Sequence, residues 1–252
     1  MDSFYQIIGN KIFFSDRRLD QYRKPIIDLF QKIDCVYNSD LPREVVKNII
    51  KKKKDCEHKI TAVRYALALI QDEMAQKISA REVREYSEMV RNGICDEAEL
   101  KNEVLIYETE AFLFQVKSSL DVLVQLLKNM PNYEKTLSLK GTIDRESFDM
   151  HDSLTKKSTC KKIKEAGDNT LADYLGSEIK NWIQELNIMR NEITHRSALE
   201  GFTCFIYASN TESLIEPKMP NGKEVDKYCE SIYNKLLELF DKVITDFIVP
   251  KL

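Results

Sequence analysis

The sequence predicts an all-α protein built as an antiparallel, up-and-down four-helix bundle, with extra N-terminal helices and a small β-hairpin before the last helix. Two observations predict this fold. Glycine and proline are scarce, at 7 and 6 of 252 residues, and charged residues make up 31% of the chain, a mixture that favours long helices over a barrel or sandwich. Long stretches of the chain also carry apolar residues at the three- and four-residue spacing of an amphipathic helix.

The overall charge and the cysteines restrict the classes of partner. The formal net charge is only −3, so any attraction to nucleic acid or to a membrane surface must be local. The six cysteines lie far apart, without a Cys-x-x-Cys pair or a Cys/His cluster at zinc spacing. No basic-then-apolar leader opens the sequence, and no apolar run approaches the roughly 20 residues that span a bilayer. We therefore expect a cytoplasmic protein with reduced thiols, without metal, cofactor or membrane association.

We expect residues 1–60 to form an N-terminal helical extension and residues 61–252 to form the bundle. Within the extension, apolar residues from Leu19 to Ile33 repeat at helical spacing. Asp40-Leu41-Pro42 predicts a second helical start, because proline suits an early helical position. The run Lys51–Lys54 is typical of a solvated helix face, although a phosphate site is the alternative.

The first long helix of the bundle is expected from Thr61 to Val90, where Asn92-Gly93 supplies the stop. Asp96, followed by Glu99 three residues later, is a variant of the capping box and predicts the start of the next helix, which runs to about Met130. The apolar residues expected to form one seam of this second helix are Leu100, Val104, Tyr107, Ala111 and Phe114. Those expected to widen its apolar face are Phe112, Leu113, Val116, Leu120, Leu123, Val124 and Leu127.

Residues 131–168 are the least regular part of the chain and predict a long loop that contains short helices. A third long helix is expected from Asn169, as its cap, to about Ser197. Its apolar stripe consists of Leu175, Ile179, Trp182, Leu186, Met189 and Ile193. Residues 202–216 break the helical period and predict the hairpin. The last helix is expected over residues 223–248.

The segment Arg190-Asn191-Glu192-Ile193-Thr194-His195 carries the most distinctive chemistry. At 100° per residue, His195 lies about 160° from Ile193 and therefore almost opposite the apolar stripe. Asn191 and Ile188 share the face of His195, and Arg190 lies on the shoulder of the stripe. We expect the imidazole to face solvent, a partner or a substrate. The alternative is a polar helix end, because histidine or arginine in a last turn stabilises the helix dipole without any other function.

Arg190, Asn191 and His195, with four residues between the arginine and the histidine, lie late in the third long helix of an expected all-α bundle. This arrangement resembles the HEPN superfamily, the higher eukaryotes and prokaryotes nucleotide-binding domains. The preceding helix around residues 110–122 also looks like the helix that packs against the motif in that family. The likeness covers roughly residues 61–250 and does not extend to residues 1–60.

The resemblance implies a homodimer in which two motif helices meet across a cleft, and a metal-independent ribonuclease that forms a 2′,3′-cyclic phosphate. It implies that His195 handles protons, that Arg190 holds the phosphate, and that Asn191 orients His195 or the phosphate. Such an enzyme could be a toxin or phage-defence effector, with RNA as substrate and an antitoxin protein as a possible partner. The alternative is a non-catalytic module of the same family that binds a nucleotide, RNA or a protein.

Further residues could support the site. A carboxylate of the second helix, either Asp121 or Glu110, could orient Arg190, but an ordinary solvated stripe with a Lys117–Asp121 pair is the alternative. Lysines of the 156–164 cluster, namely Lys157, Lys161 and Lys162, could guide an RNA backbone, but a solvated loop is the alternative. His58 and His151 show no evident partner and are expected at the surface.

Overall fold

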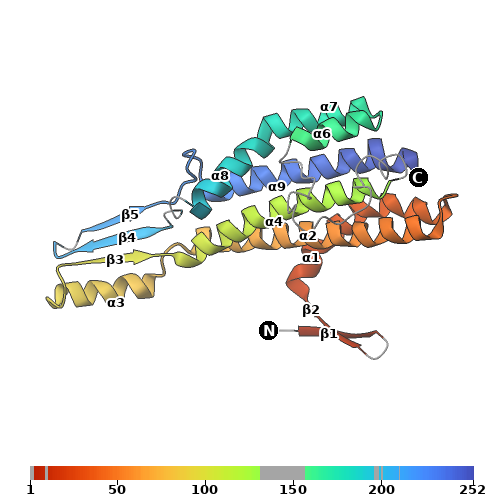
Figure 1. The fold of residues 1–252 in the computed structure, drawn as a ribbon. Helices are drawn as coiled ribbons and strands as arrows, with labels where there is room; N and C mark the ends of the chain where they lie inside the picture. Colours follow the sequence, from red (N-terminus) through yellow and green to blue (C-terminus); the bar gives the residue numbers. More distant parts are fainter. Residues whose placement is uncertain (1–2, 9–10, 131–156, 196–198, 200, 210) are drawn as a thin grey trace, which may run out of the picture. The chain divides into compact units, whose positions relative to one another are not determined.

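The computed structural model of the chain is predominantly helical, with small antiparallel sheets (Figure 1). It describes residues 3–8, 11–130, 157–195, 199, 201–209 and 211–252, and their side chains from Tyr22 onward except at residues 157, 158, 194 and 195. The chain divides into two compact units. The first unit comprises Met1–Tyr65, Gln115–Glu185 and Asn234–Leu252, and the second unit comprises Ala66–Phe114 and Leu186–Tyr233. The expected boundary at residue 60 falls inside a helix, Arg43–Gln76.

The first unit is formed mainly by helices. Its elements are β1 (Ser3–Ile8), β2 (Lys11–Asp16), α1 (Arg17–Gln31), a 3₁₀ helix (Lys32–Asn38), the start of α2 (Arg43–Gln76), the end of α4 (Glu103–Lys128), α6 (Lys157–Glu165), α7 (Asn169–Glu178), a π-helical turn (Ile179–Ile183), the start of α8 (Gln184–His195), the end of α9 (Val225–Lys242), a π-helical turn (Val243–Ile248) and a 3₁₀ turn (Val249–Lys251). Aromatic pairs join these elements. Phe30 meets Phe240 edge-on at 5.7 Å between ring centres, and Tyr174 stacks on Phe247 at 6.0 Å.

The second unit contains a three-stranded antiparallel sheet. Its elements are the end of α2, α3 (Ala80–Arg91), β3 (Glu97–Lys101), the start of α4, most of α8, β4 (Thr203–Tyr207), β5 (Glu212–Ile215) and the start of α9. The strand order is β3-β4-β5, with Phe205 opposite both Glu99 and Ser213. On one face of the sheet, Cys204 and Ile206 form a small core with Val90 of α3. Phe205 belongs to the other face, because successive strand residues point to opposite sides.

Residues 3–8 and 11–16 form strands instead of the expected helix. Strands β1 and β2 pair as an antiparallel hairpin, with Ser3 opposite Asp16 and Ile8 opposite Lys11. The sequence carried a signal for this hairpin: Gly9-Asn10 stands between two runs rich in aromatic and β-branched residues. The helical expectation holds from Arg17 onward, in α1 and α2.

The expected single helix from Thr61 to Val90 is wrong, because the chain breaks between α2 and α3. Lys77 has a positive φ of 54°, which ends α2. Ser79 then caps α3: its side chain accepts a hydrogen bond from the Glu82 amide, and the Glu82 carboxylate accepts one from the Ser79 amide. The predicted stop at Asn92-Gly93 is confirmed, with Gly93 at φ 69°.

The predicted capping box at Asp96 and Glu99 is also wrong, because residues 97–101 form strand β3. Ala98 and Leu100 pack toward α3, whereas Glu97, Glu99 and Lys101 are exposed, so the burial follows the two-residue period of a strand. Helix α4 begins after Asn102, whose side-chain oxygen accepts a hydrogen bond from the Leu105 amide at 3.1 Å.

The seam expected on the second helix turns outward. Val104, Tyr107, Ala111 and Phe114 are exposed, and only Leu100, in β3, is buried. The residues expected to widen the apolar face are instead the core residues of α4, since Phe112, Leu113, Val116, Leu120, Leu123, Val124 and Leu127 are all buried. Helix α4 therefore presents an exposed aromatic stripe within the second unit.

The C-terminal expectations are largely confirmed. The third helix runs from α7 through a π-helical turn to the end of α8 at His195, and all six residues of its predicted stripe are buried. Its cap is Asp168 rather than Asn169, because the Asp168 carboxylate accepts the Leu171 amide at 2.9 Å. The hairpin β4–β5 and the last helix, α9 with its π-helical turn, are also present. Of the expected loop 131–168, residues 131–156 lie outside the described residues, His151 included.

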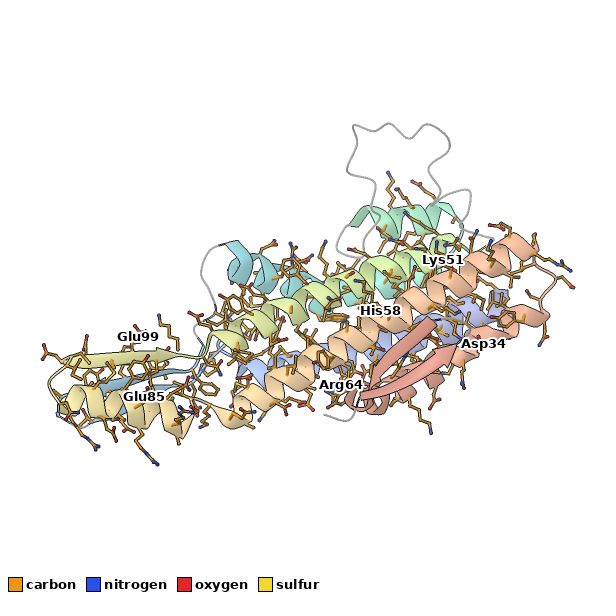
Figure 2. The ribbon with its side chains drawn as sticks, turned by 90° about the horizontal axis from the view of Figure 1, so that it is seen from below. Asp34, Lys51, His58, Arg64, Glu85 and Glu99 are labelled. Carbon is orange, nitrogen blue, oxygen red and sulfur yellow. The ribbon has the colours of Figure 1, made fainter. Side chains whose placement is uncertain are left out.

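The four-lysine run of α2 is only partly a solvated face. Lys51 and His58, both labelled in Figure 2, are exposed. Lys54 is exposed as well. Lys53 is buried and pairs with Asp34 at 2.5 Å.

Candidate functional site

The Arg-Asn-x-x-x-His segment lies at the end of α8, in the second unit, and His195 is the last residue of the helix. Asn191 is exposed and Arg190 is half-buried, while the His195 side chain lies outside the described residues. Ile188, two residues before the motif, is 48% exposed although it is apolar. The predicted outward face of the helix is therefore confirmed for Ile188 and Asn191, and the direction of the imidazole stays a prediction.

The Arg190 guanidinium lies over an aromatic ring of α4. Its central carbon is 5.0 Å from the centre of the Phe114 ring, and its Nε is buried without a hydrogen-bond partner. No carboxylate among the described residues forms an ion pair with it. A cation–π contact contributes about 0.5–2 kcal/mol, whereas desolvating an unpaired ion costs several kcal/mol. The guanidinium is therefore held in place while its charge is left uncompensated, which suits an anionic ligand.

The two candidate carboxylates lie in different places. Glu110 belongs to the second unit, where it lines a cavity and forms no ion pair with Arg190 in the described part of the chain. Asp121 belongs to the first unit and pairs with Lys117 at 3.6 Å, as the alternative interpretation of this stripe predicted. One oxygen of Asp121 is buried without a hydrogen-bond partner. The structure therefore joins neither carboxylate to Arg190.

The candidate RNA-binding lysines lie in α6, in the first unit, whereas Arg190 lies in the second. The side chain of Lys157 lies outside the described residues, Lys161 is exposed, and Lys162 is half-buried. Lys161 approaches Glu165 at 3.9 Å, as expected for a solvated helix. These lysines and the motif are not brought together by any described contact.

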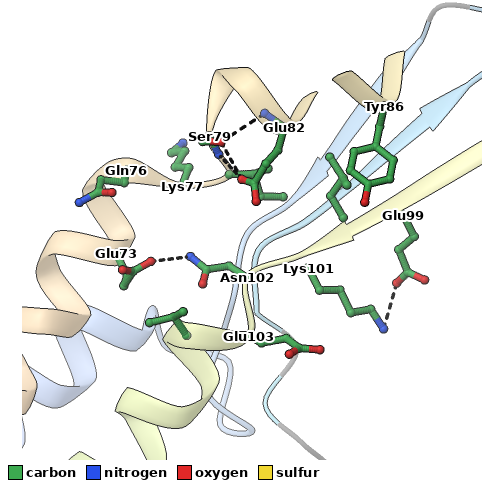
Figure 3. A pocket seen from close by; sticks show the side chains of 13 residues that line it. Glu73, Gln76, Lys77, Ser79, Glu82, Tyr86, Glu99, Lys101, Asn102 and Glu103 are labelled. Atoms are coloured by element: carbon green, nitrogen blue, oxygen red, sulfur yellow. Dashed lines mark hydrogen bonds and ion pairs between the residues drawn. The ribbon is translucent and has the colours of Figure 1, made fainter. Parts of the chain in front are cut away.

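A cavity of about 680 Å³ lies where α2, α3, β3 and α4 meet, and we call it the capping cavity (Figure 3). Several of its polar side chains form hydrogen bonds at the end of α2 and at the starts of α3 and α4. The Asn102 amide donates a hydrogen bond to Glu73 at 2.9 Å, and the Ser79–Glu82 capping box forms another wall. Lys101 pairs with Glu99 at 3.0 Å. Six of its polar side chains, those of Glu73, Ser79, Glu82, Glu99, Lys101 and Asn102, are thus engaged in structural contacts.

A second cavity, of about 460 Å³, lies between α4 and the sheet face that α3 does not cover, and we call it the sheet-face cavity. Its lining combines aliphatic, aromatic and charged residues. They are Ile106, Leu199, Gly201, Thr203 and Ile215, the aromatic Tyr107 and Phe205, and the charged Glu99, Lys101, Glu103 and Glu110.

Sequence reasoning did not find the aromatic residues of this region. Tyr107 and Phe114 were assigned to the core, although they are 64% and 43% exposed. The sequence did contain a signal for their exposure, because they alternate with acidic residues. Glu103, Tyr107, Glu110 and Phe114 follow one another at spacings of three or four residues on one helix face. A buried apolar seam would not carry glutamates on the same face.

Glu108 and Tyr174 are among the groups outside the motif that have shifted pKa values. Burial, together with the nearby charge of Glu73, raises the pKa of Glu108 above its usual value. Burial, together with the charges of Glu178, Glu238 and Asp246, raises the pKa of Tyr174 to about 12.

The described side chains include no group of three or more His, Cys, Asp or Glu residues that could hold a metal ion. Within the same part of the chain, every helix is too short or too polar to cross a membrane. No protein-family model, curated protein or solved structure matches this chain.

Proposed function

We propose that the chain is a metal-independent endoribonuclease of the HEPN type, a cytoplasmic homodimer built on an up-and-down four-helix bundle, with its active site at the dimer interface. RNA is the proposed substrate. The enzyme would serve as a toxin or phage-defence effector, with an antitoxin protein as its regulator. The proposal depends on the resemblance of Arg190, Asn191 and His195 to the family motif.

The main structural support for the proposal is the environment of the Arg190 guanidinium. Its guanidinium is fixed against Phe114, with one buried nitrogen that lacks a hydrogen-bond partner and no carboxylate paired to it among the described residues. A planar guanidinium presents a fork of N–H donors that matches two phosphate oxygens. A scissile phosphate bound there would receive both hydrogen bonds and charge, and the charge that develops during cleavage would be stabilised.

The proposed reaction moves one proton in and one proton out. The ribose 2′-hydroxyl loses its proton to a base and attacks the adjacent phosphorus. The bond to the 5′-oxygen of the next nucleotide breaks, and that oxygen takes a proton from an acid. The products are a 2′,3′-cyclic phosphate and a 5′-hydroxyl end. Imidazole titrates near neutral pH and can serve either step, so His195 is the proposed proton carrier.

A dimer would supply two copies of the motif to one substrate. The exposed Ile188 and Asn191 mark a surface of α8 that combines an apolar side chain with a carboxamide. An apolar residue exposed beside a polar motif suits a protein interface. Asn191 would orient the phosphate or the partner's imidazole across it.

The test is incubation of the purified protein with total RNA in EDTA, with cyclic-phosphate ends as the readout. We expect cleavage by the wild type, and a loss of about 10²–10⁴-fold in His195→Ala and in Arg190→Ala. His58→Ala and Arg84→Ala are matched controls, because both residues are exposed on other helices. Circular dichroism checks that each variant is folded.

Cleavage that survives His195→Ala at the wild-type rate, or that depends on a metal ion, would refute the proposal. RNA binding without any cleavage by the wild type would instead support the non-catalytic nucleotide- or RNA-binding module.

A further inference from the structure

The sheet-face cavity has the size and lining of a ligand site. Its volume of about 460 Å³ falls within the roughly 300–1,000 Å³ typical of such pockets. Its aliphatic surface comes from Ile106, Leu199 and Ile215, and two aromatic rings, Tyr107 and Phe205, also line it. All of these residues belong to the second unit.

The rings are available for contact. Phe205 lies on the sheet face opposite the small core under α3, where it stacks with Tyr207 at 6.3 Å between ring centres. Tyr107 is 64% exposed on α4. Neither ring carries a cation from the described residues.

The charge of the cavity is negative. Three glutamates line it, and the single lysine there, Lys101, is already paired with Glu99 at 3.0 Å. Glu103 and Glu110 form no ion pair with any described residue. Two carboxylates therefore stand on either side of Tyr107 along one face of α4, at a spacing of four and three residues.

The same helix face already holds a guanidinium at its next ring. Phe114, one turn after Glu110, carries the guanidinium of Arg190 at 5.0 Å. Tyr107 is the aromatic residue two turns before Phe114 on the same face of α4. It has Glu103 and Glu110 beside it, and no cation from the described residues lies on its ring. We propose that the sheet-face cavity binds an arginine side chain of a partner protein, with the guanidinium on Tyr107 between Glu103 and Glu110.

Arginine fits the cavity better than lysine. Its guanidinium is planar and weakly hydrated, it stacks on aromatic faces, and it donates two parallel hydrogen bonds to a carboxylate. Lysine would bring a strongly hydrated ammonium into a cavity with an apolar floor. A nucleic acid is disfavoured because its phosphates would meet two unpaired carboxylates.

The surroundings of the cavity suit a protein as the source of the arginine. Val104 on α4 and Ile215 on β5 are exposed apolar residues of the same unit. Arginine and aromatic residues are enriched at the centres of protein interfaces, surrounded by apolar contacts. This inference does not depend on the ribonuclease proposal, because no residue of the Arg190–His195 segment takes part in it.

The test is a methyl NMR titration of the full chain that follows Ile106, Leu199 and Ile215. The probe is N-acetyl-arginine amide, and its neutral isostere, N-acetyl-citrulline amide, is the matched ligand control. We expect saturable shifts with the arginine amide and binding at least about tenfold weaker with the citrulline amide. Equal binding of the two amides would overturn the proposal.

Variants locate the binding on the protein. Glu103→Gln combined with Glu110→Gln should weaken arginine amide binding by about tenfold or more, and Tyr107→Leu should do so independently. Glu85→Gln combined with Glu88→Gln removes the same charge from exposed positions of α3 and should leave the affinity unchanged. An equal loss in this control would show a general charge effect and sink the proposal.

Two further ligands separate the sources of the cation. Spermidine supplies ammonium groups without a guanidinium, and tetrauridine supplies phosphates with bases. If spermidine and tetrauridine both bind more weakly than the arginine amide, the result supports an arginine side chain of a partner protein as the ligand. Tighter binding of spermidine would replace the protein partner with a polyamine, and tighter binding of tetrauridine would overturn the cation site.

Discussion

At the scale of single residues, Gly201 shows why the chain needs a glycine beside the sheet-face cavity. A Cβ built on Gly201 would lie 2.5 Å from the Asn102 carbonyl oxygen and 3.3 Å from a side-chain carbon of Ile106. The neighbouring backbone has little room to move, because the backbone N–H of Asn102 donates a hydrogen bond to the Phe202 carbonyl at 2.9 Å. Close approach of two backbones is therefore the reason for this glycine.

We accordingly expect Gly201→Ala to lower the free energy of unfolding by about 1–3 kcal/mol, the usual effect of overpacking. Gly176→Ala is the matched control, because nothing lies within 4 Å of the added Cβ in α7. This control should be neutral or stabilising by about 0.4–1 kcal/mol. Urea denaturation followed by circular dichroism measures both. Equal effects at the two positions would mean that the contact at Asn102 relaxes freely.

Residue-level prediction from the sequence was best where periodicity and chemistry agreed. Ile188 and Asn191 were placed outward by angle alone, and both are exposed. Tyr107 and Phe114 were misplaced because an apolar residue is not always a buried one. The contact of Arg190 with Phe114 joins two helices far apart in sequence, and periodicity within one helix carries no such information.

At the scale of elements, long helices and the β4–β5 hairpin were predictable, because their signals lie within a continuous stretch of sequence. Strand β3 was not, since its partner β4 lies about a hundred residues later and the five residues Glu97–Lys101 also suit a helix start. The π-helical turn at Ile179–Ile183 could not be seen at a fixed 100° per residue. In β3, pairing with β4 overrode the local preference of the sequence.

Helix α2 shows how one element handles a buried charge. Lys53 is buried between Asp34, at 2.5 Å, and Glu57, at 3.6 Å. Burial raises the pKa of Glu57 above its usual value, and the charge of Lys53 opposes this only in part. The pKa of Glu57 is therefore higher in the folded protein than in the unfolded chain. The contribution of Glu57 to the free energy of unfolding is complete at a pH below its pKa in the unfolded chain. This contribution is lost as the pH rises through its pKa in the folded protein.

Glu57→Gln removes this titration and keeps the shape of the side chain. We expect the stability of the variant relative to wild type to increase between about pH 4 and pH 7, because only the wild type then ionises a buried carboxyl. Glu44→Gln, at an exposed position of the same helix, controls for the loss of one charge. Denaturant midpoints at several pH values provide the measurement. A relative stability that falls over this range would contradict the direction of the pKa shift.

At the scale of the whole molecule, the chain is divided in a way that composition does not reveal. Domain boundaries usually fall in linkers rich in proline, glycine or polar residues. Here the two units are assembled from non-contiguous segments, and the divisions fall within helices such as α2 and α4. The sequence therefore offered no signal for these divisions, and the expected boundary near residue 60 followed the expected start of a helix at Thr61, which the family resemblance then matched.

Each unit carries a buried thiol that reports on its own packing. Cys56 lies in the first unit and Cys229 in the second, and both are fully buried. Burial raises the pKa of both thiols well above the usual range. Cys35, in the first unit, is exposed. Because the thiolate is the reactive form, burial protects Cys56 and Cys229 both by excluding the reagent and by suppressing ionisation.

We expect Ellman's reagent to label Cys35 rapidly in the native protein and to label Cys56 and Cys229 only when their units open. Variants that retain one of these three cysteines, with the others changed to serine or alanine, assign each rate. In 6 M guanidinium all three should react alike, since packing no longer distinguishes them (about 6 M exceeds typical unfolding midpoints). If Cys229 reacted as fast as Cys35 without denaturant, the core of the second unit around α9 would be open in solution. The two proposed sites, one at Phe114 and one at Tyr107, would then lack a rigid scaffold.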